Sequence, residues 1–402
     1  MGDLPPELQH KSFIRTGDKK TGGPNLRLNR LEMDKPSLTV TGYIFNKFVH
    51  PTENRYITPR EAAILQDFPD TYKFSGHLGK VQEQVGNAVP VRLGTAIAGS
   101  VANYLRTLGV DGTVSIASFF SGPGGFDLGF EAYRSSDIRF DTVYSTDNDE
   151  ASIGTIRDNR PTWNPERADI QELESSAVTN FVEGKSSIVI GGPPCQPFSI
   201  AGKQRGTSDQ SGVLYRDFVR LVSDLSPHLV VMENVYGLLQ VKAGTVLLDI
   251  QDAFNRIGYQ ILYKQLLAAD YGTPQKRKRL ILVGIPTQNF GSVPFNFPEP
   301  AYAPEGNVLG LPRYVGAGES IIHLPPPGIR GRKERDDCSG GCRSVDFQWW
   351  ESVLREVVEW PISRPRTASG SQAARSPSSA AQVQWPRGGR ESTPSRGCSC
   401  KR

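Results

Sequence analysis

Short apolar runs rich in β-branched residues alternate with amphipathic stretches between residues 114 and 285, and this alternation constrains the fold more than any other feature. It predicts strands at residues 114–120, 142–146, 187–190, 229–232, 259–268 and 280–285, and helices at 126–133, 149–160, 214–225 and 246–257. Strands and helices that alternate at this spacing form a doubly wound α/β sheet in which most strands are parallel. Ligands of such sheets bind beyond the carboxyl ends of the strands.

Two further helices are predicted before this region. Thr58, Pro59 and Glu61 match the capping-box pattern of a helix start, and that helix ends before Pro69. A turn is predicted at residues 86–90, followed by a helix that extends to about Leu108.

Charge and cysteine content limit the function classes. The net charge is +4, but the segment from Arg364 to Arg402 holds eight Lys or Arg and one Glu, so the rest of the chain carries about −3. No signal peptide and no apolar run of roughly 20 residues is seen, so we expect no membrane insertion. Five cysteines with none before Cys195 do not form a disulfide framework, which favours a reduced cytoplasmic compartment.

Cys195 is the candidate nucleophile. It follows the apolar run 187–190 and the sequence Gly-Gly-Pro-Pro, and another proline stands at position 197. Prolines on both sides hold the thiol on a rigid, non-helical loop at a strand end. The alternative is a buried structural cysteine, which would more naturally lie within a strand or helix.

A glycine-rich turn predicts a nucleotide-like ligand. Phe120-Ser-Gly122-Pro-Gly124-Gly follows the first strand and opens a helix, where a ligand can approach the backbone. The same turn can also simply reverse the chain. Asp147, at the end of the next strand, is placed to hydrogen-bond ribose hydroxyls; the alternative is an N-cap of the next helix.

Two more strand ends carry charged residues. Glu233 follows an apolar strand and can act as a proton donor, or alternatively can cap a helix. In Gln275-Lys-Arg277-Lys-Arg279, strand alternation places Gln275, Arg277 and Arg279 on one face. Two arginines on one face can bind a base edge or a phosphate, whereas a bare charge run is usually solvated surface.

These motifs together resemble a known family. Residues 120–125, 193–196, 233–235 and 275–279 resemble successive motifs of the cytosine-C5 DNA methyltransferases. Residues 55–69 and 84–90 resemble the family's last motifs but here precede the others, so the chain resembles the circularly permuted bacterial subgroup. Two positions depart from the family pattern: Ser118 stands where an acid is frequent, and Asn148 where an aromatic side chain often lies against adenine.

The resemblance implies a fold and a domain plan. The expected fold is the doubly wound methyltransferase sheet with a small loop-rich DNA-recognition region. Residues 1–110 would be the permuted end, with part of the recognition region, the closing motifs and a long helix. Residues 111–290 would form the catalytic domain, 291–360 a remnant of the recognition region and 361–402 a disordered basic tail.

The resemblance also implies a mechanism. Cys195 would add to C6 of a cytosine flipped out of double-stranded DNA, and Glu233 would donate to N3. S-adenosylmethionine would then methylate C5, leaving S-adenosylhomocysteine. Arg279, with Arg277 behind it, would contact the base oxygen or a flanking phosphate.

The remaining expectations concern binding. Ser199, Lys203 and Arg205 resemble the loop that closes over DNA, and no metal is expected. We expect a monomer in the bacterial cytoplasm that associates with the nucleoid when acting, and a functional partner in a cognate restriction endonuclease. The expected cofactor-binding residues are Asn87, Phe120, Gly122, Gly124, Asp147, Asn148, Asp169, Pro194 and Leu214.

Three alternatives stay open. An RNA cytosine-C5 methyltransferase would share the motifs, although Pro-Cys-Gln favours DNA. A nicotinamide-dependent oxidoreductase would use the glycine-rich turn but explains neither Cys195 nor the arginine strand. A catalytically silent relative that only binds DNA fits the sequence after Arg335, which does not resemble a folded recognition domain. Zinc binding by Cys338, Cys342, Cys398 and Cys400 is a weaker alternative because the spacing is long and lacks histidine.

Overall fold

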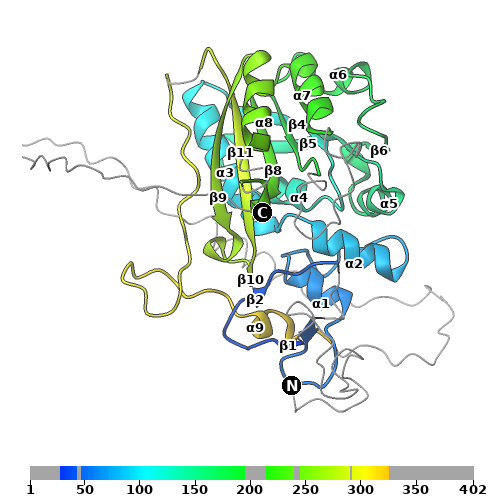
Figure 1. Ribbon diagram of the computed structural model, residues 1–402, viewed down its shortest axis with the longest axis vertical. Helices are drawn as coiled ribbons and strands as arrows, with labels where there is room; N and C mark the ends of the chain where they lie inside the picture. The colour runs from blue at the N-terminus through cyan, green and yellow to red at the C-terminus, as the bar shows by residue number, and fades with distance from the viewer. Residues whose placement is uncertain (1–27, 43–46, 195–213, 240–244, 290–291, 326–402) are drawn as a thin grey trace, which may run out of the picture. The chain divides into compact units, whose positions relative to one another are not determined.

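A computed structural model describes residues 28–42, 47–194, 214–239, 245–289 and 292–325 (Figure 1). Cys195, Ser199, Lys203, Arg205 and the residues after 325 lie outside this part of the chain. None of the helices in it is both long and apolar enough to cross a membrane. The strands are β1 (Asn29–Arg30), β2 (Ser37–Leu38), β3 (Phe48–Val49), β4 (Gly112–Phe119), β5 (Ile138–Asp147), β6 (Pro165–Arg167), β7 (Ser187–Gly191), β8 (Leu229–Val235), β9 (Tyr259–Leu267), β10 (Gln275–Lys276) and β11 (Lys278–Pro286). The α-helices are α1 (Pro59–Ile64), α2 (Leu78–Asn87), α3 (Val91–Thr107), α4 (Gly125–Ala132), α5 (Glu150–Asn159), α6 (Ser176–Val182), α7 (Leu214–Leu225), α8 (Thr245–Arg256) and α9 (Ala317–Ile321).

A seven-stranded sheet forms the centre of the described chain, in the order β6-β5-β4-β7-β8-β11-β9. The neighbouring pairs from β6 to β8 are parallel, whereas β11 is antiparallel to both β8 and β9. The chain leaves β4 toward β5 on one side and later returns to β7 on the other. This reversal of strand order is the switch point at which α/β sheets bind ligands. The predicted doubly wound α/β fold is confirmed.

Alternating side chains of the strands feed two separate cores. One face buries Ile116, Ile190 and Val231 with apolar residues of α3 and α4. The opposite face buries Ala117, Val189 and Val230 with apolar residues of α6, α7 and α8. Because successive strand residues point to opposite faces, near-continuous apolar strands are what a sheet covered on both sides requires.

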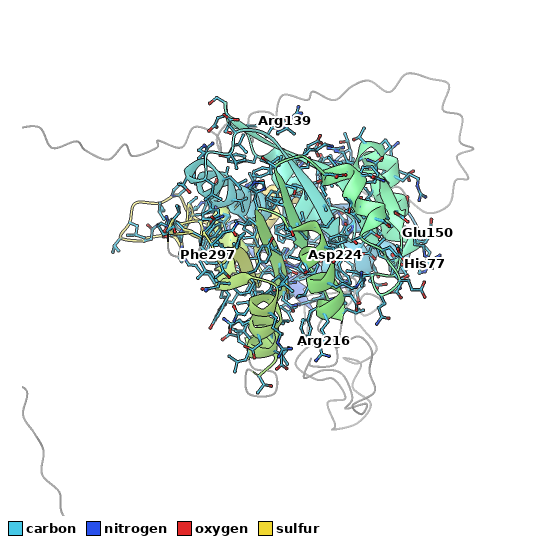
Figure 2. The ribbon with its side chains drawn as sticks, turned by 90° about the horizontal axis from the view of Figure 1, so that it is seen from above. His77, Arg139, Glu150, Arg216, Asp224 and Phe297 are labelled. Atoms are coloured by element: carbon cyan, nitrogen blue, oxygen red, sulfur yellow. The ribbon has the colours of Figure 1, made fainter. Side chains whose placement is uncertain are left out.

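Helix α2 corrects the turn predicted at residues 86–90. Gly86 and Asn87 are the last residues of this helix, and only residues 88–90 connect it to α3. Its two glycines and polar residues gave no helical signal, since glycine disfavours helix interiors. Tertiary contacts supply the stability instead: Gln84 is buried, donates to the Ser75 carbonyl (2.8 Å) and accepts from Thr155 of α5 (2.6 Å). Figure 2 labels His77 and Glu150, the N-cap of α2 and the first residue of α5.

A third core joins distant parts of the chain. We call residues 28–42 and 47–89 together with α9 the N-terminal lobe; its apolar residues pack with Ile153 and Ile156 of α5. Two amides at the start of α9 donate to this lobe, Ala317 to the Lys35 carbonyl (2.8 Å) and Gly318 to the Glu32 carbonyl (2.9 Å). A Cβ at Gly316 would lie 1.9 Å from the Met33 carbonyl oxygen, so only glycine allows this approach.

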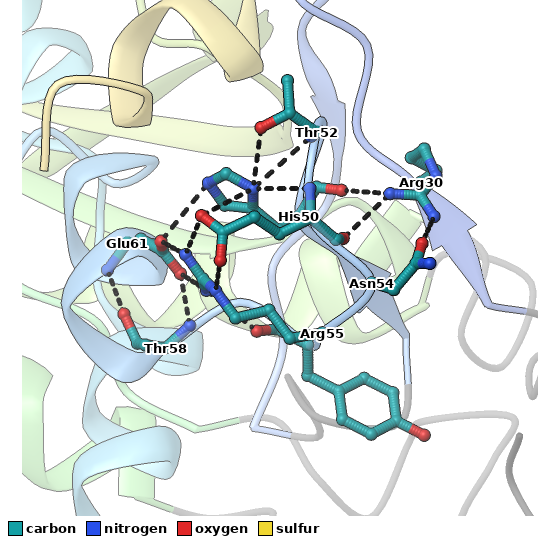
Figure 3. Close-up of polar contacts among 9 residues, drawn as sticks. Arg30, His50, Thr52, Asn54, Arg55, Thr58 and Glu61 are labelled. Carbon is teal, nitrogen blue, oxygen red and sulfur yellow. Dashed lines mark hydrogen bonds and ion pairs between the residues drawn. The ribbon is translucent and has the colours of Figure 1, made fainter. Parts of the chain in front are cut away.

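A buried charge cluster fixes the entry to α1 (Figure 3). Glu61 completes the predicted capping box with Thr58 and accepts two hydrogen bonds from the Arg55 guanidinium, at 2.7 and 2.9 Å. His50 lies 3.6 Å from the same carboxylate, and burial, followed by Arg55, lowers the pKa of His50. Bidentate arginine–carboxylate pairs hold their geometry well, so this cluster ties β3 to α1.

Candidate active site

A pocket opens at the carboxyl ends of β4 and β5. Five of its residues were predicted from the sequence to bind a cofactor, namely Phe120, Asp147, Asn148, Asp169 and Leu214. The remaining wall is formed by Thr146, Ala168, Ile170 and Gln171. Four apolar and five polar residues therefore line one concavity, a combination that suits a small molecule with both apolar and polar parts.

The glycine-rich turn beside the pocket has an unusual backbone. Gly122 and Gly124 have φ values of 53° and 81°, in the left-handed region that favours glycine. Phe120 has a φ of 55° although it carries a Cβ, a conformation that costs on the order of 1 kcal/mol. A Cβ at Gly124 would also lie 2.9 Å from the Trp163 ring. The backbone of this turn thus requires glycine at positions 122 and 124.

Asp147 links this turn to the next strand. One of its carboxylate oxygens accepts from the Gly122 amide and the other from the Asp149 amide, both at 2.9 Å. The N-cap of α5 is Asp149, so the alternative in which Asp147 caps that helix is wrong. Burial raises the pKa of Asp147, while the two backbone hydrogen bonds oppose the shift. Its carboxylate keeps acceptor capacity for a further hydroxyl group.

Not every predicted cofactor residue reaches the pocket. Asn87 is exposed at the last residue of α2, and Pro194 is the last described residue before the gap at 195–213; neither lines the pocket. Gly122 and Gly124 belong to the adjoining turn. The structure also reveals an anchor that sequence reasoning missed: the Tyr72 hydroxyl donates to the Pro123 carbonyl oxygen at 2.7 Å.

The second group of predicted residues meets at the ends of β8 and β11. Glu233 and Arg279 form an ion pair with Oε1 and Nε 2.5 Å apart, and each side chain is 12% exposed. Burial lowers the pKa of Arg279, and Glu233 opposes this shift. A Cβ placed on Gly192 would lie 3.3 Å from Glu233 Oε2, so the carboxylate lies against the segment that leads to Cys195. The carboxyl ends of β4, β5, β7 and β8 share one sheet edge because these strands are parallel.

Asn234 positions that same segment. Its side-chain amide donates to the Pro193 carbonyl oxygen at 3.1 Å, and its side-chain oxygen accepts from the Val235 amide at 2.9 Å. Asn234 is buried, so these bonds are shielded from water. Sequence reasoning assigned this residue no role; an asparagine directly after a strand-end acid is the signal that could have indicated one.

Arg277 does not contribute its side chain to this site. It has no exposed surface, and its two terminal nitrogens donate to the carbonyl oxygens of Val40 and Gly86, both at 2.9 Å. Burial, followed by the neighbouring Arg279, lowers the pKa of Arg277. The structure thus places the Arg277 side chain against the N-terminal lobe, which differs from the catalytic role predicted for it.

Gln275 acts with Arg277 to hold the N-terminal lobe. Its side-chain oxygen accepts from the Val40 amide at 2.8 Å, and its side-chain nitrogen donates to the Leu65 carbonyl oxygen at 3.0 Å. Both backbone groups of Val40 are therefore satisfied by side chains of the predicted arginine strand. The predicted alternation agrees with the structure, since Gln275 and Arg277 are buried while Lys276 and Lys278 are exposed.

Gly86 allows α2 to pack closely against the backbone of residues 41–42, and its substitution tests this contact. A Cβ at Gly86 would lie 2.3 Å from the Gly42 nitrogen and 2.4 Å from the Thr41 carbonyl carbon, both backbone atoms. We expect Gly86→Ala to destabilise the protein by roughly 1–3 kcal/mol because of this overlap. Gly99→Ala is the matched control, since a Cβ there meets only Tyr133 at 3.5 Å. We expect a lower melting temperature for Gly86→Ala than for Gly99→Ala. Equal melting temperatures would contradict the close contact between Gly86 and residues 41–42.

No group of three or more His, Cys, Asp or Glu side chains able to hold a metal ion occurs within the described ranges. The four cysteines weighed for zinc, at positions 338, 342, 398 and 400, lie outside those ranges.

A family model described as C-5 cytosine-specific DNA methylase matches residues 8–103 and 114–314. The Type II methyltransferase M.PspPI of Psychrobacter sp. is 35% identical over 206 residues, covering 51% of this chain and 46% of that protein. M.AquIA of Picosynechococcus sp. is 34% identical over 229 residues, covering 52% of this chain and 89% of that protein.

Among solved structures, a DNA modification methyltransferase encoded within an E. coli prophage is 30% identical. The match covers 44% of this chain and 47% of that one, with a TM-score of 0.37. The chain spans about half the length of several curated relatives that it matches, such as 46% for M.PspPI and 56% for M1.HphI of Haemophilus parahaemolyticus.

Proposed function

Because this chain belongs to the C-5 cytosine-specific DNA methylase family, we propose that it transfers a methyl group from S-adenosylmethionine to C5 of a cytosine in double-stranded DNA. The named relatives are Type II methyltransferases, which supports a role in a restriction–modification system with a cognate endonuclease as functional partner. We expect a monomer that works in the bacterial cytoplasm at the nucleoid.

One observation carries the proposal: the Glu233–Arg279 ion pair lies against Gly192, on the same sheet edge as the pocket at β4 and β5. A proton donor, a cation and a small-molecule pocket thus surround the segment that leads to Cys195. An oxidoreductase with the same glycine-rich turn has no use for such a pair beside a cysteine loop.

The residues of the pocket fit S-adenosylmethionine. Phe120, Ile170 and Leu214 offer apolar surface for a base, and the acceptor oxygens of Asp147 suit ribose hydroxyls. Glycines with positive φ keep the turn free of side chains beside this space. When bound, the cofactor supplies an electrophilic methyl group on a positively charged sulfur.

The chain's own residues prepare the cytosine. C5 of cytosine is a weak nucleophile, so we propose that the Cys195 thiolate adds to C6 and makes C5 electron-rich. Glu233 donates a proton to N3, which neutralises the charge that develops on the ring. Arg279 holds Glu233 and contacts the base oxygen or a flanking phosphate. C5 then takes up the methyl group. A base removes the C5 proton, and expulsion of Cys195 as the thiolate returns the N3 proton to Glu233.

A stacked base hides C6, so the cytosine has to be flipped out of the duplex. We propose Ser199, Lys203 and Arg205 as DNA contacts during this step, on the resemblance of their sequence to the family's closing loop. Asn234 holds the segment before Cys195 through its bond to the Pro193 carbonyl oxygen. We propose that this bond restricts the direction from which the thiol approaches C6.

We also propose that the chain is circularly permuted and that its recognition region involves both ends. Residues 8–103 and 114–314 match the family model as separate pieces, and α9 packs on residues 32–35 of the N-terminal lobe. The predicted boundaries at residues 110, 290 and 360 belong to this proposal.

Bisulfite sequencing of DNA from cells that lack 5-methylcytosine and express this chain tests the function. We expect methylation at one short recurring sequence. Methyl transfer to tRNA but not to duplex DNA would instead identify an RNA methyltransferase. Binding of duplex DNA without any methyl transfer would identify a catalytically silent relative, the alternative that the sequence after Arg335 suggests.

Lys276 and Lys278 provide a prediction for DNA binding. Both are exposed, they lie on either side of the buried Arg277, and neither forms an ion pair with another described residue. We expect the double change to Gln to weaken binding to all sequences alike and to reduce the slope of log K against log salt by roughly 2. Lys185→Gln, at the other end of the sheet before β7, is the control. An unchanged salt slope measured by fluorescence anisotropy would remove these lysines from the interface.

A further inference from the structure

Asp127 is a buried acid that the proposed chemistry does not use. It lies in the first turn of α4 and has no exposed surface. One carboxylate oxygen accepts from the Ser118 hydroxyl of β4 at 3.1 Å, and the other accepts from the Thr142 hydroxyl of β5 at 3.2 Å. The carboxylate thus joins the two strands whose ends form the pocket.

The Ser118 side of this arrangement continues into the cofactor turn. Ser121 Oγ lies 2.9 Å from Ser118 Oγ and 3.2 Å from the Thr146 carbonyl oxygen. The Ser121 amide also donates to the Thr146 carbonyl oxygen at 3.0 Å. Thr146 lines the pocket, and Ser121 lies between Phe120 and Gly122. The Thr142 hydroxyl does not continue toward the turn: within the described residues its hydrogen bond is to Asp127.

Burial of this acid is unfavourable on its own. Burial raises the pKa of Asp127 to about 6, and the hydroxyl bonds from Ser118 and Thr142 oppose the shift. No Lys, Arg or His of the described chain forms an ion pair with it, and the nearby Glu131 adds to the shift. An apolar residue of similar size would usually stabilise such a site at least as well, so stability does not explain the acid.

We infer that Asp127 is a positioning residue for the cofactor turn, acting through Ser118 and Ser121 to fix the backbone at Phe120 and Gly122 against the end of β5. This inference rests on the proposed function, because it assigns the turn to S-adenosylmethionine. It also gives Ser118 a role at a position where the related motif often has an acid: the carboxylate comes from the helix instead of the strand.

Two buried hydroxyls that donate to the same carboxylate make a matched pair of variants. Ser118→Ala breaks the path to the turn, whereas Thr142→Val removes a hydroxyl bond of similar length and leaves the path intact. By titration calorimetry with S-adenosylmethionine, we expect Ser118→Ala to raise Kd roughly tenfold, the usual effect of a lost hydrogen bond to a charged group. Thr142→Val should change Kd less than about twofold although both variants lose thermal stability.

Two further variants guard against misfolding. Ser118→Thr keeps the hydroxyl and should restore wild-type affinity. Ser121→Ala leaves both bonds to Asp127 in place and should weaken binding as Ser118→Ala does. Equal Kd values for Ser118→Ala and Thr142→Val, or for Ser121→Ala and wild type, would overturn the positioning role. A wild-type chain that melts cooperatively but binds no S-adenosylmethionine would instead overturn the proposed function and this inference with it.

Discussion

Replacement of Cys195 by serine is expected to abolish methylation, lowering kcat by at least roughly 10⁴-fold, because the alcohol is a far weaker nucleophile than the thiolate. Affinity for S-adenosylmethionine should stay within about twofold, since the pocket is lined by residues at or after the ends of β4, β5 and β6 and by Leu214. The measurement is methyl transfer to DNA carrying the sequence found by bisulfite sequencing, together with titration calorimetry of the cofactor.

Cys338→Ser is the matched control for this prediction, because it makes the same chemical change at a cysteine outside all of the motifs. We expect it to retain wild-type activity. If Cys195→Ser still produces 5-methylcytosine, the covalent mechanism is wrong even if the family assignment stands.

The second large effect is expected for Glu233→Gln. Gln has nearly the same shape but cannot supply the proton to N3, so we expect kcat to fall roughly 10²–10⁴-fold. The change also removes the ion pair between Glu233 and Arg279, and the Arg279 side chain is only 12% exposed. A largely buried arginine without its carboxylate also destabilises the protein, so melting temperatures have to be measured together with the rates.

Glu131→Gln separates the two contributions. Glu131 of α4 forms an ion pair with Arg160 at 2.8 Å, and Glu131 does not line the pocket. We expect this control to lose little stability and no activity, as is usual for a partly exposed pair. A Glu233→Gln enzyme with wild-type kcat would show that another group protonates the cytosine.

Most of the central sheet could be predicted from local sequence. Helix α7 ends at Leu225 as predicted, and each strand predicted between residues 114 and 285 occurs within a few residues of its expected place. Fully buried strands need apolar β-branched runs on both faces, and this need leaves a clear local pattern. Helix α2 leaves no such pattern, because its stability comes from Gln84 and from contacts with α5.

The arginine strand shows where local pattern stops being informative. Alternation correctly places Gln275, Arg277 and Arg279 on one face. It cannot distinguish an arginine that faces Glu233 from one that faces the carbonyl groups of Val40 and Gly86. Those partners lie 40 or more positions away in the sequence, so only the folded chain assigns the two roles.

The sequence by itself determined the α/β sheet, the strand ends that carry the motifs, the family, and the residues Glu233, Asp147 and Arg279 as candidates. The tertiary structure decided that Arg277 holds the N-terminal lobe, that Asn234 holds Pro193, and that Asp127 reaches the cofactor turn through Ser118. The physical reason is burial: a polar group inside the protein needs a partner, and distant segments supply that partner.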